Sequence, residues 1–406
     1  MMVVKLAWRN IWRNKRRTWI TIASILFAVL FGSFMEALQQ GAWGNMINNV
    51  VNFYMGYGQI HQKGYWEEQV IDKAFAMDPA QQQQVEAIPQ IAALVPRIES
   101  FGLASAGHTT RGALIIGIEP EAEQLLTKLK ERVVEGEYLE AGDQSVMVAK
   151  GLAQTLKLTV NDTLVIISQG YHGVNAAGKY LIKGIVHFGS PELNKQMIYL
   201  PLQEAQHFYG AEGLLTSIAL KIEDQDDIDV GLKAIREVLD TTAYEVMKWD
   251  ALLPDLVQAK SLDSAGNYVV YFILYSIIAF GLFGTILMMT KEREYEFGVL
   301  VGIGMRRFKL SGVVWLEIIM LGMLGALAGI LVSAPIVWYF KLNPIRFSGN
   351  YAGLLEKFGF EPIFPAAFDP MIFVSQALIV FVITALLALY PWVKIRRLQP
   401  VEAMRD

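Results

Sequence analysis

Four long runs of apolar residues set the strongest limit on what this chain can fold into. They lie at residues 19–38, 268–290, 310–340 and 371–392. Each is long enough to cross a lipid bilayer, which takes roughly 20 apolar residues in a helix. A segment inside hydrocarbon must satisfy its own backbone hydrogen bonds, so these runs predict four transmembrane helices.

Basic residues flank the apolar runs in three places, and cytoplasmic loops carry an excess of Lys and Arg. Lys15, Arg16 and Arg17 precede the first run; Lys291, Arg293, Arg306, Arg307 and Lys309 lie between the second and third; Lys394, Arg396, Arg397 and Arg405 follow the fourth. Four spans place all three groups on the cytoplasmic side. We therefore expect both termini inside, with residues 41–266 and 341–370 outside.

The long stretch between the first two runs has ordinary polarity, although 53% of the whole chain is hydrophobic and only 18% is charged. Strand patterns recur in it, for example at Thr163–Ser168. A helix capped by Asp78 and Pro79 is predicted over Ala80–Ala87, and a second helix over Pro120–Val134. The expected fold is an α-helical membrane protein with four transmembrane helices, one before and three after a large extracytoplasmic α/β domain.

These patterns predict the following division of the chain. An amphipathic interfacial helix occupies 1–18, transmembrane helices occupy 19–40, 267–290, 310–340 and 371–393, the outer domain occupies 41–266, a cytoplasmic hairpin occupies 291–309, an outer loop occupies 341–370 and a cytoplasmic tail occupies 394–406.

The opening segment has the pattern of an amphipathic helix. Its apolar face holds Val4, Ala7, Trp8, Ile11 and Trp12, and its opposite face holds Lys5, Arg9, Arg13 and Arg16. A basic helix with tryptophans on its apolar side suits the inner-leaflet interface. The alternative is the positive flank of a cleaved signal peptide, but the apolar run that follows is too long for one.

Several kinds of site are disfavoured by the sequence. The net charge of −4 argues against general nucleic-acid binding. The chain has no cysteine, which excludes disulfides and thiolate sites. Gly173–Lys179 has phosphate-loop spacing, but Tyr180 stands where Ser or Thr must hold magnesium, so we expect a glycine-rich hairpin loop there. The five histidines show no metal-ligand spacing.

The hairpin KEREYEFGVLVGIGMRRFK at residues 291–309 has an unusual composition. Three glutamates alternate with Lys291 and Arg293, an apolar segment follows at Phe297–Leu300, and Gly302 and Gly304 let the chain turn back. This pattern predicts a short cytoplasmic helix with a charged rim and an apolar tip, suited to a groove in a soluble partner. The alternative is an inert loop that only obeys the positive-inside rule.

The hairpin and both ends of the chain resemble one known family. The hairpin is similar to the "ERxxEIGxLxAxGAxRxxI" segment of the MacB/LolC/FtsX-type ABC transporter permeases, through Arg293, Glu296, Gly298, Leu300, Gly304 and Arg307, with Glu317 matching a later acid. The opening AWRNIWRNKRRTWIT resembles the family's N-terminus. The ending IRRLQPVEAMRD resembles its closing pattern through Arg397, Pro400, Glu402, Ala403 and Arg405.

The resemblance implies a permease subunit of the cell inner membrane, not an enzyme, with a periplasmic outer domain. It implies that the hairpin docks on a separate cytoplasmic ABC ATPase dimer, and that ATP and Mg bind to that ATPase, with no cofactor, metal or catalytic residue on this chain. The implied ATPase-coupling residues are Lys291, Arg293, Glu294, Glu296, Phe297, Gly298, Leu300, Gly304, Arg306 and Arg307. Four spans enclose no path, which implies a second permease copy or a related permease.

The outer-domain segments YGQIHQKGYWEE, SQGYHG and FGSPELNKQMIYLPLQEAQ look most like the lipoprotein-releasing LolC/LolE branch of this family. That branch implies mechanotransmission, in which ATPase closure moves the outer domain, and extraction of lipoproteins from the bilayer for a periplasmic carrier. Two alternatives stay open. One is MacB-like export of drugs, peptides or other amphiphiles, and the other is FtsX-like regulation of cell-wall hydrolases.

Overall fold

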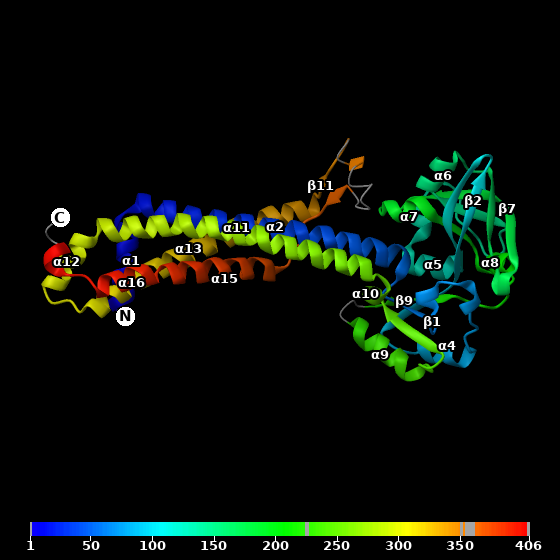
Figure 1. The fold of residues 1–406 in the computed structure, drawn as a ribbon, viewed down its shortest axis with the longest axis horizontal. Helices are drawn as coiled ribbons and strands as arrows, with labels where there is room; N and C mark the ends of the chain where they lie inside the picture. The colour runs from blue at the N-terminus through cyan, green and yellow to red at the C-terminus, as the bar shows by residue number, and fades with distance from the viewer. Residues whose placement is uncertain (1, 224–226, 350–351, 354–361, 404–406) are drawn as a thin grey trace. The chain divides into compact units, whose positions relative to one another are not determined.

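The computed structural model of the protein describes residues 2–223, 227–349, 352–353 and 362–403 (Figure 1). Its contacts divide the chain into two compact units. The helical unit comprises Met1–Gly44, Lys260–Arg346 and Ile363–Asp406, and the α/β unit comprises Asn45–Ala259 and Phe347–Pro362. Arg405, which the family resemblance used, lies outside the described residues.

The helical unit is built from long apolar helices and a few short ones. The long helices are α2 (Lys15–Val50), α11 (Pro254–Glu292), α13 (Arg307–Leu342) and α15 (Pro370–Leu387); the short ones are α1 (Met2–Arg13), α12 (Glu294–Gly302), α16 (Leu389–Arg396) and α17 (Pro400–Ala403). Strands β11 (Ile345–Arg346) and β12 (Ile363–Phe364) form a small ribbon. Four described helical segments are long and apolar enough to cross a membrane, at Lys15–Met55, Pro254–Glu292, Arg307–Leu342 and Pro370–Arg396. This arrangement confirms the expected one-plus-three order.

The helices extend beyond the apolar runs that predicted them. Helix α2 continues past residue 40 to Val50, and α11 begins at Pro254 rather than near 267. The apolar pattern marks only the part of a helix that suits hydrocarbon, whereas a helix in water tolerates polar residues. The opening segment also differs from one continuous helix, because the helical pattern is interrupted at Asn14.

Small residues of α13 let it pack closely against α2. A Cβ atom at Gly325 would lie 2.5 Å from Cβ of Ile25, and one at Gly329 would lie 2.6 Å from Cβ of Val29. Glycines four residues apart on one helix face allow two membrane helices to approach closely. Helix α2, the first span, therefore packs closely against α13, the third span, along this glycine face.

The α/β unit contains a ten-stranded, mostly antiparallel sheet. Its strands are β1 (Gly58–Gln62), β2 (Ile91–Ala106), β3 (Thr109–Ile118), β4 (Val133–Gly136), β5 (Ser145–Ala149), β6 (Thr163–Gln169), β7 (Asn175–Val186), β8 (Met197–Pro201), β9 (Ser217–Ile222) and β10 (Tyr244–Lys248). The order is β10-β1-β9-β2-β3-β8-β5-β7-β4, with β6 pairing to β2 and β7. The pairs β3–β8 and β5–β7 are parallel.

Helices pack on this sheet around separate apolar clusters. They are α3 (Tyr65–Glu68), α4 (Pro79–Glu86), α5 (Pro120–Thr127), α6 (Lys150–Leu156), α7 (Pro191–Gln196), α8 (Leu202–Tyr209), α9 (Ile228–Val238) and α10 (Trp249–Leu252). In Figure 1, α4 and α9 lie beside β1, in the smaller lobe of this unit, whereas α6 and α8 lie beside β2 and β7. The mixed α/β character expected for this stretch is confirmed.

Two local expectations were wrong. The helix predicted over Pro120–Val134 ends at Thr127, because Lys128 adopts a left-handed conformation (φ 50°) and Val133 begins β4, which pairs with β7. The glycine-rich hairpin loop predicted at Gly173–Lys179 is mostly strand. Gly178 and Lys179 lie in β7, paired with Ile166 and Val165 of β6.

A buried polar network lies where the π-helical turn Val51–Met55 meets the sheet. Arg97 forms a fully buried bidentate pair with Glu123, with N–O distances of 2.7 and 2.9 Å, and also donates to the carbonyl oxygen of Tyr54. The Tyr54 and Ser217 hydroxyls donate to the Glu99 carboxylate at 2.7 and 3.1 Å. Burial raises the pKa of Glu99 above its ordinary value.

Candidate functional site

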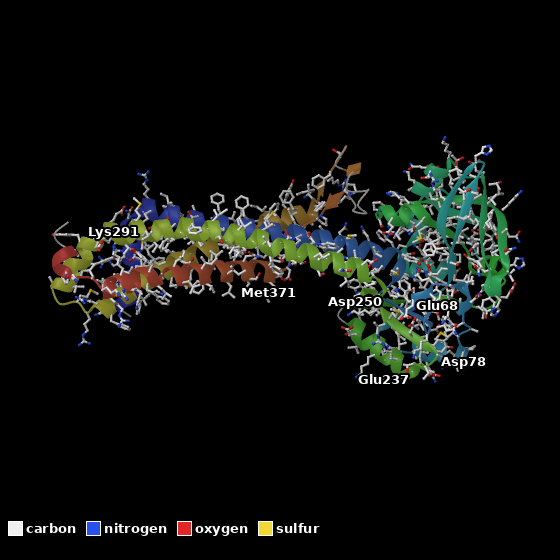
Figure 2. All side chains as sticks on the ribbon, viewed as in Figure 1. Glu68, Asp78, Glu237, Asp250, Lys291 and Met371 are labelled. Atoms are coloured by element: carbon white, nitrogen blue, oxygen red, sulfur yellow. The ribbon has the colours of Figure 1, made fainter. Side chains whose placement is uncertain are left out.

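The charged hairpin folds as a short helix between two long ones. Helix α11 ends at Glu292, Arg293 leaves the helical conformation (φ −103°), and α12 follows at Glu294–Gly302. Gly304 takes a φ of 102°, which glycine adopts at little cost, and α13 starts at Arg307. Lys291 marks this place in Figure 2, at the end of the helical unit where Figure 1 shows α1, α12 and α16.

The apolar segment of α12 faces inward, contrary to the free apolar tip that the sequence suggested. The Phe297 side chain is 1% exposed and packs with Ile286, Leu310 and Ile395 in one apolar cluster. Leu300 packs against the same cluster. Because Phe297 is an anchor of α12 to its own chain, it is not available to a partner.

The first link of α12 to the rest of the chain is an ion pair with helix α1. Arg13 donates from Nη2 to both carboxylate oxygens of Glu296, at 2.6 and 2.7 Å. Arg17, at the start of α2, pairs with Glu292 at the end of α11. Burial disfavours the charged form of Glu296, but Arg13 and Arg293 outweigh it and hold its pKa below the ordinary value.

A second link joins the hairpin to α13. Arg293 donates from Nη1 to both carboxylate oxygens of Glu317 at 2.9 Å, and the Glu317 side chain is only 4% exposed. The Arg293 guanidinium also lies 5.2 Å from the ring centroid of Phe297, within cation–π range. Breaking a largely buried pair leaves an uncompensated charge, so this contact fixes the turn between α11 and α12.

A third link joins α12 to α16. Glu294 pairs with Lys291 at 3.0 Å and with Lys394 at 3.1 Å. Burial raises the pKa of Glu294, but the two ammonium groups outweigh it and the net pKa lies below the ordinary value. The glutamates that the sequence suggested as a rim for a partner are therefore engaged within the chain.

The remaining predicted coupling residues differ in exposure. Gly304, Arg306 and Arg307 are exposed, whereas Gly298 is buried beside Phe297. Sequence reasoning missed the most exposed apolar side chains of this segment, which are Ile303 at 76% and Phe308 at 66%. It also missed the roles of Arg13, Arg17 and Lys394, because nothing in a linear pattern pairs residues so far apart.

The described residues offer no metal site of three or more His, Cys, Asp or Glu side chains. His61, for example, is buried between Tyr65 and Trp66, and burial lowers its pKa to about 3. Gly178 and Lys179 lie inside a strand, so the residues with phosphate-loop spacing do not fold as a phosphate-binding loop. The hairpin is the candidate functional site.

Two family models match this chain. Residues 18–238, more than half of it, match the MacB-like periplasmic core domain, and residues 268–400 match the FtsX-like permease C-terminal domain. The chain is 21% identical over 333 residues to the lipoprotein-releasing system transmembrane protein LolC of Xylella fastidiosa (strain 9a5c), covering 78% of both chains. It is 21% identical over 327 residues to the protein of the same name from Neisseria meningitidis serogroup B (strain ATCC BAA-335 / MC58), again covering 78% of both.

Among solved structures, the periplasmic region of MacB from Actinobacillus actinomycetemcomitans is 14% identical, with a TM-score of 0.36, and is covered over 97% of its length by 52% of this chain. The extracellular domain of the ABC-type transporter YknZ gives a TM-score of 0.35 at 14% identity, covering 47% of this chain and 99% of that one.

The two family models and the four candidate spans define a multi-pass membrane permease with a periplasmic domain. The chain belongs to the MacB/FtsX superfamily of ABC transporter permeases, whose members work with a partner ATPase.

Proposed function

We propose that this chain is a permease subunit that extracts lipoproteins from the inner membrane and passes them to a periplasmic carrier. The observation that carries this proposal is its similarity to two LolC proteins of lipoprotein-releasing systems, which extends over 78% of each chain. An alignment of that extent covers membrane helices as well as outer domain, so a shared task is the simplest account of it.

In this proposal a separate cytoplasmic ABC ATPase supplies the energy and binds ATP and Mg. The ATPase docks on the hairpin at residues 291–309, which we call the coupling segment. The exposed side of this segment consists of Tyr295, Ile303, Arg306, Arg307 and Phe308. Exposed apolar side chains beside arginines are typical of the anchors of protein interfaces. A groove of about 1060 Å³ beside α12, lined in part by Tyr295, Tyr390 and Val393, gives a partner side chain a place to enter.

The engaged residues of the segment have a different task. Glu294 and Glu296 tie α12 to α16 and α1, Arg293 ties the turn before α12 to α13, and Glu292 ties the end of α11 to α2. A push on α12 therefore reaches several helices at once, which supports mechanotransmission to the outer domain. Both termini are cytoplasmic in this proposal, and two permease chains, identical or related, form the working assembly in the bilayer.

Depletion of the chain in the organism that carries it tests the cargo. Lipoprotein release predicts that lipoproteins destined for the outer membrane accumulate in the inner membrane. Correct sorting after depletion contradicts the proposal.

A second candidate function is export of drugs, peptides or other amphiphiles. The match of residues 18–238 to the MacB-like periplasmic core domain favours it. Depletion would then change tolerance to such compounds while lipoproteins sort normally. A third outcome, copurification of a cell-wall hydrolase without any moved cargo, would indicate FtsX-like regulation.

A further inference from the structure

Helix α1 has two sides that do different things. On its inner side, Ala7 and Ile11 are buried, and Ile11 packs with Ile22 and Leu321 of the neighbouring helices. The helix stops at Asn14, where the Thr18 hydroxyl donates to the backbone carbonyls of Asn14 and Ile11. Helix α1 is thus a separate helix within the helical unit, packed against α2 and α13.

The outer side of α1 and the first turns of α2 are strongly basic and aromatic. Lys5 and Arg9 of α1 are exposed, as are Lys15 and Arg16 of α2, and no acidic residue occurs in the chain before Glu36. Trp8 and Trp19 are 43% and 59% exposed, and their rings lie edge to face with Trp12 at centroid distances of 5.9 and 6.3 Å. Tryptophan rings favour the headgroup level of a bilayer, and clustered cations favour anionic lipid.

The C-terminal end of α1 contacts α12. Arg13 is the last residue of α1, and it makes the bidentate contact with Glu296 of α12. Arg17, just after the interruption at Asn14, pairs with Glu292. A change in how α1 lies on its surroundings therefore shifts the two arginines that position α12.

We propose that α1 is a lipid-sensing element: anionic phospholipid headgroups of the inner leaflet bind its exposed cations and thereby fix α12 for ATPase docking. The proposal rests on the proposed function, which places α1 and α12 on the cytoplasmic side. The occupant is a lipid surface because the cations and the tryptophans occur together within residues 5–19, at the start of a membrane span. A nucleic acid or an acidic protein would use the cations but not the apolar rings.

The test uses the full chain in lipid nanodiscs without any ATPase. One set contains phosphatidylcholine only, and in the other part of it is replaced by phosphatidylglycerol at the same ionic strength. Amide hydrogen exchange is followed in α1 and in α12. We expect phosphatidylglycerol to slow exchange in both helices severalfold, and added salt to reduce the effect because it screens exposed charges.

Three variants decide the mechanism. Lys5→Gln with Arg9→Gln should lose most of the lipid response, because each cation near an anionic surface contributes roughly a fivefold preference. Arg13→Gln should keep the response of α1 and lose that of α12. The matched control Arg396→Gln with Arg397→Gln removes two exposed cations at the chain's other cytoplasmic end and should respond like the wild type.

Each contrary result overturns the proposal. These are an absent response to phosphatidylglycerol, an unchanged response in the Lys5 and Arg9 variant, or a response of α12 that persists without Arg13. Because no ATPase or cargo takes part, the outcome is independent of lipoprotein sorting. Failure of the lipid-sensing proposal is thereby distinguishable from failure of the proposed function.

Discussion

Arg13 and Glu296 lie 283 positions apart in the chain, yet two hydrogen bonds of 2.6 and 2.7 Å join their side chains. The contact connects the helix that precedes the first membrane span to the helix between the second and third. A half-exposed ion pair of this kind adds only about 0.2–1 kcal/mol to stability. Its main effect is to orient α12, because it fixes the position of this helix relative to α1.

We predict that Arg13→Gln and Glu296→Gln each lower ATP hydrolysis by the assembled transporter severalfold, with little change in the melting temperature of the permease. The double variant should be no worse than either single one, because both remove the same contact. Arg111→Gln, which removes an exposed cation of the α/β unit, is the control. Additive losses would show that the two side chains act separately.

The exposed side of the coupling segment gives a second prediction. Ile303→Asp should weaken ATPase binding about tenfold or more, because it places a charge in the apolar centre of the proposed interface. Val174→Asp, at an apolar side chain of the α/β unit that is 54% exposed, should leave binding unchanged. Copurification and titration with the ATPase measure both, and equal binding by Ile303→Asp would remove this surface from the account.

The glycine face of α13 gives a third prediction, on stability. Gly329→Ala should destabilise the permease by about 1–3 kcal/mol, because its new methyl group would overlap Val29 on α2. Gly281→Ala in α11 is the matched control, since nothing lies within 4 Å of its Cβ position. That substitution should be neutral or should stabilise the helix slightly. Unfolding of both variants in detergent makes the comparison, and equal melting would mean that α2 and α13 do not pack closely.

The buried carboxyl group of Glu99 gives a fourth prediction, on pH. Burial raises its folded-state pKa above the ordinary value of 4.5. The folded state therefore binds this proton more tightly than the unfolded state does. The contribution of Glu99 to stability is greatest below pH 4.5 and falls as the pH rises through the folded-state pKa.

We expect Glu99→Gln to remove that decline, since glutamine can still accept hydrogen bonds from Tyr54 and Ser217 without carrying charge. Hydrogen exchange in β2 of the full chain, followed from pH 4.5 upward, measures the difference between wild type and variant. Glu135→Gln, at an exposed carboxylate, should follow the wild type. A parallel pH dependence in wild type and Glu99→Gln would contradict the assignment.

Much of the fold could be predicted because its strongest signals are local. An apolar run as long as 371–392 is stable as a helix in hydrocarbon, and the alternation in Thr163–Ser168 marks a strand that the structure ends one residue later, at Gln169. Signals that depend on distant partners failed. Residues 128–134 continue a helical pattern, but pairing of β4 with β7 draws them into a turn and a strand.

The candidate site shows the same limit. The sequence identified the segment, but several side chains that it suggested as contacts for a partner make contacts within the chain instead. Phe297 and Leu300 were expected at a free tip, but a cluster from α11, α13 and α16 was available to bury them. The glutamates were expected at a rim for a partner, but Arg13, Arg17 and Lys394 reach them first. No local pattern encodes such contacts.

The central claim is that the segment from Lys291 to Lys309 faces the cell interior and receives force from a separate ATPase. The chain contains no cysteine, so Ile303→Cys provides a single reactive thiol there. In inside-out membrane vesicles, a membrane-impermeant thiol reagent should label this cysteine, and the bound ATPase should protect it and crosslink to it. Labelling only in right-side-out vesicles, or undiminished labelling in the presence of a functional ATPase, would contradict the account.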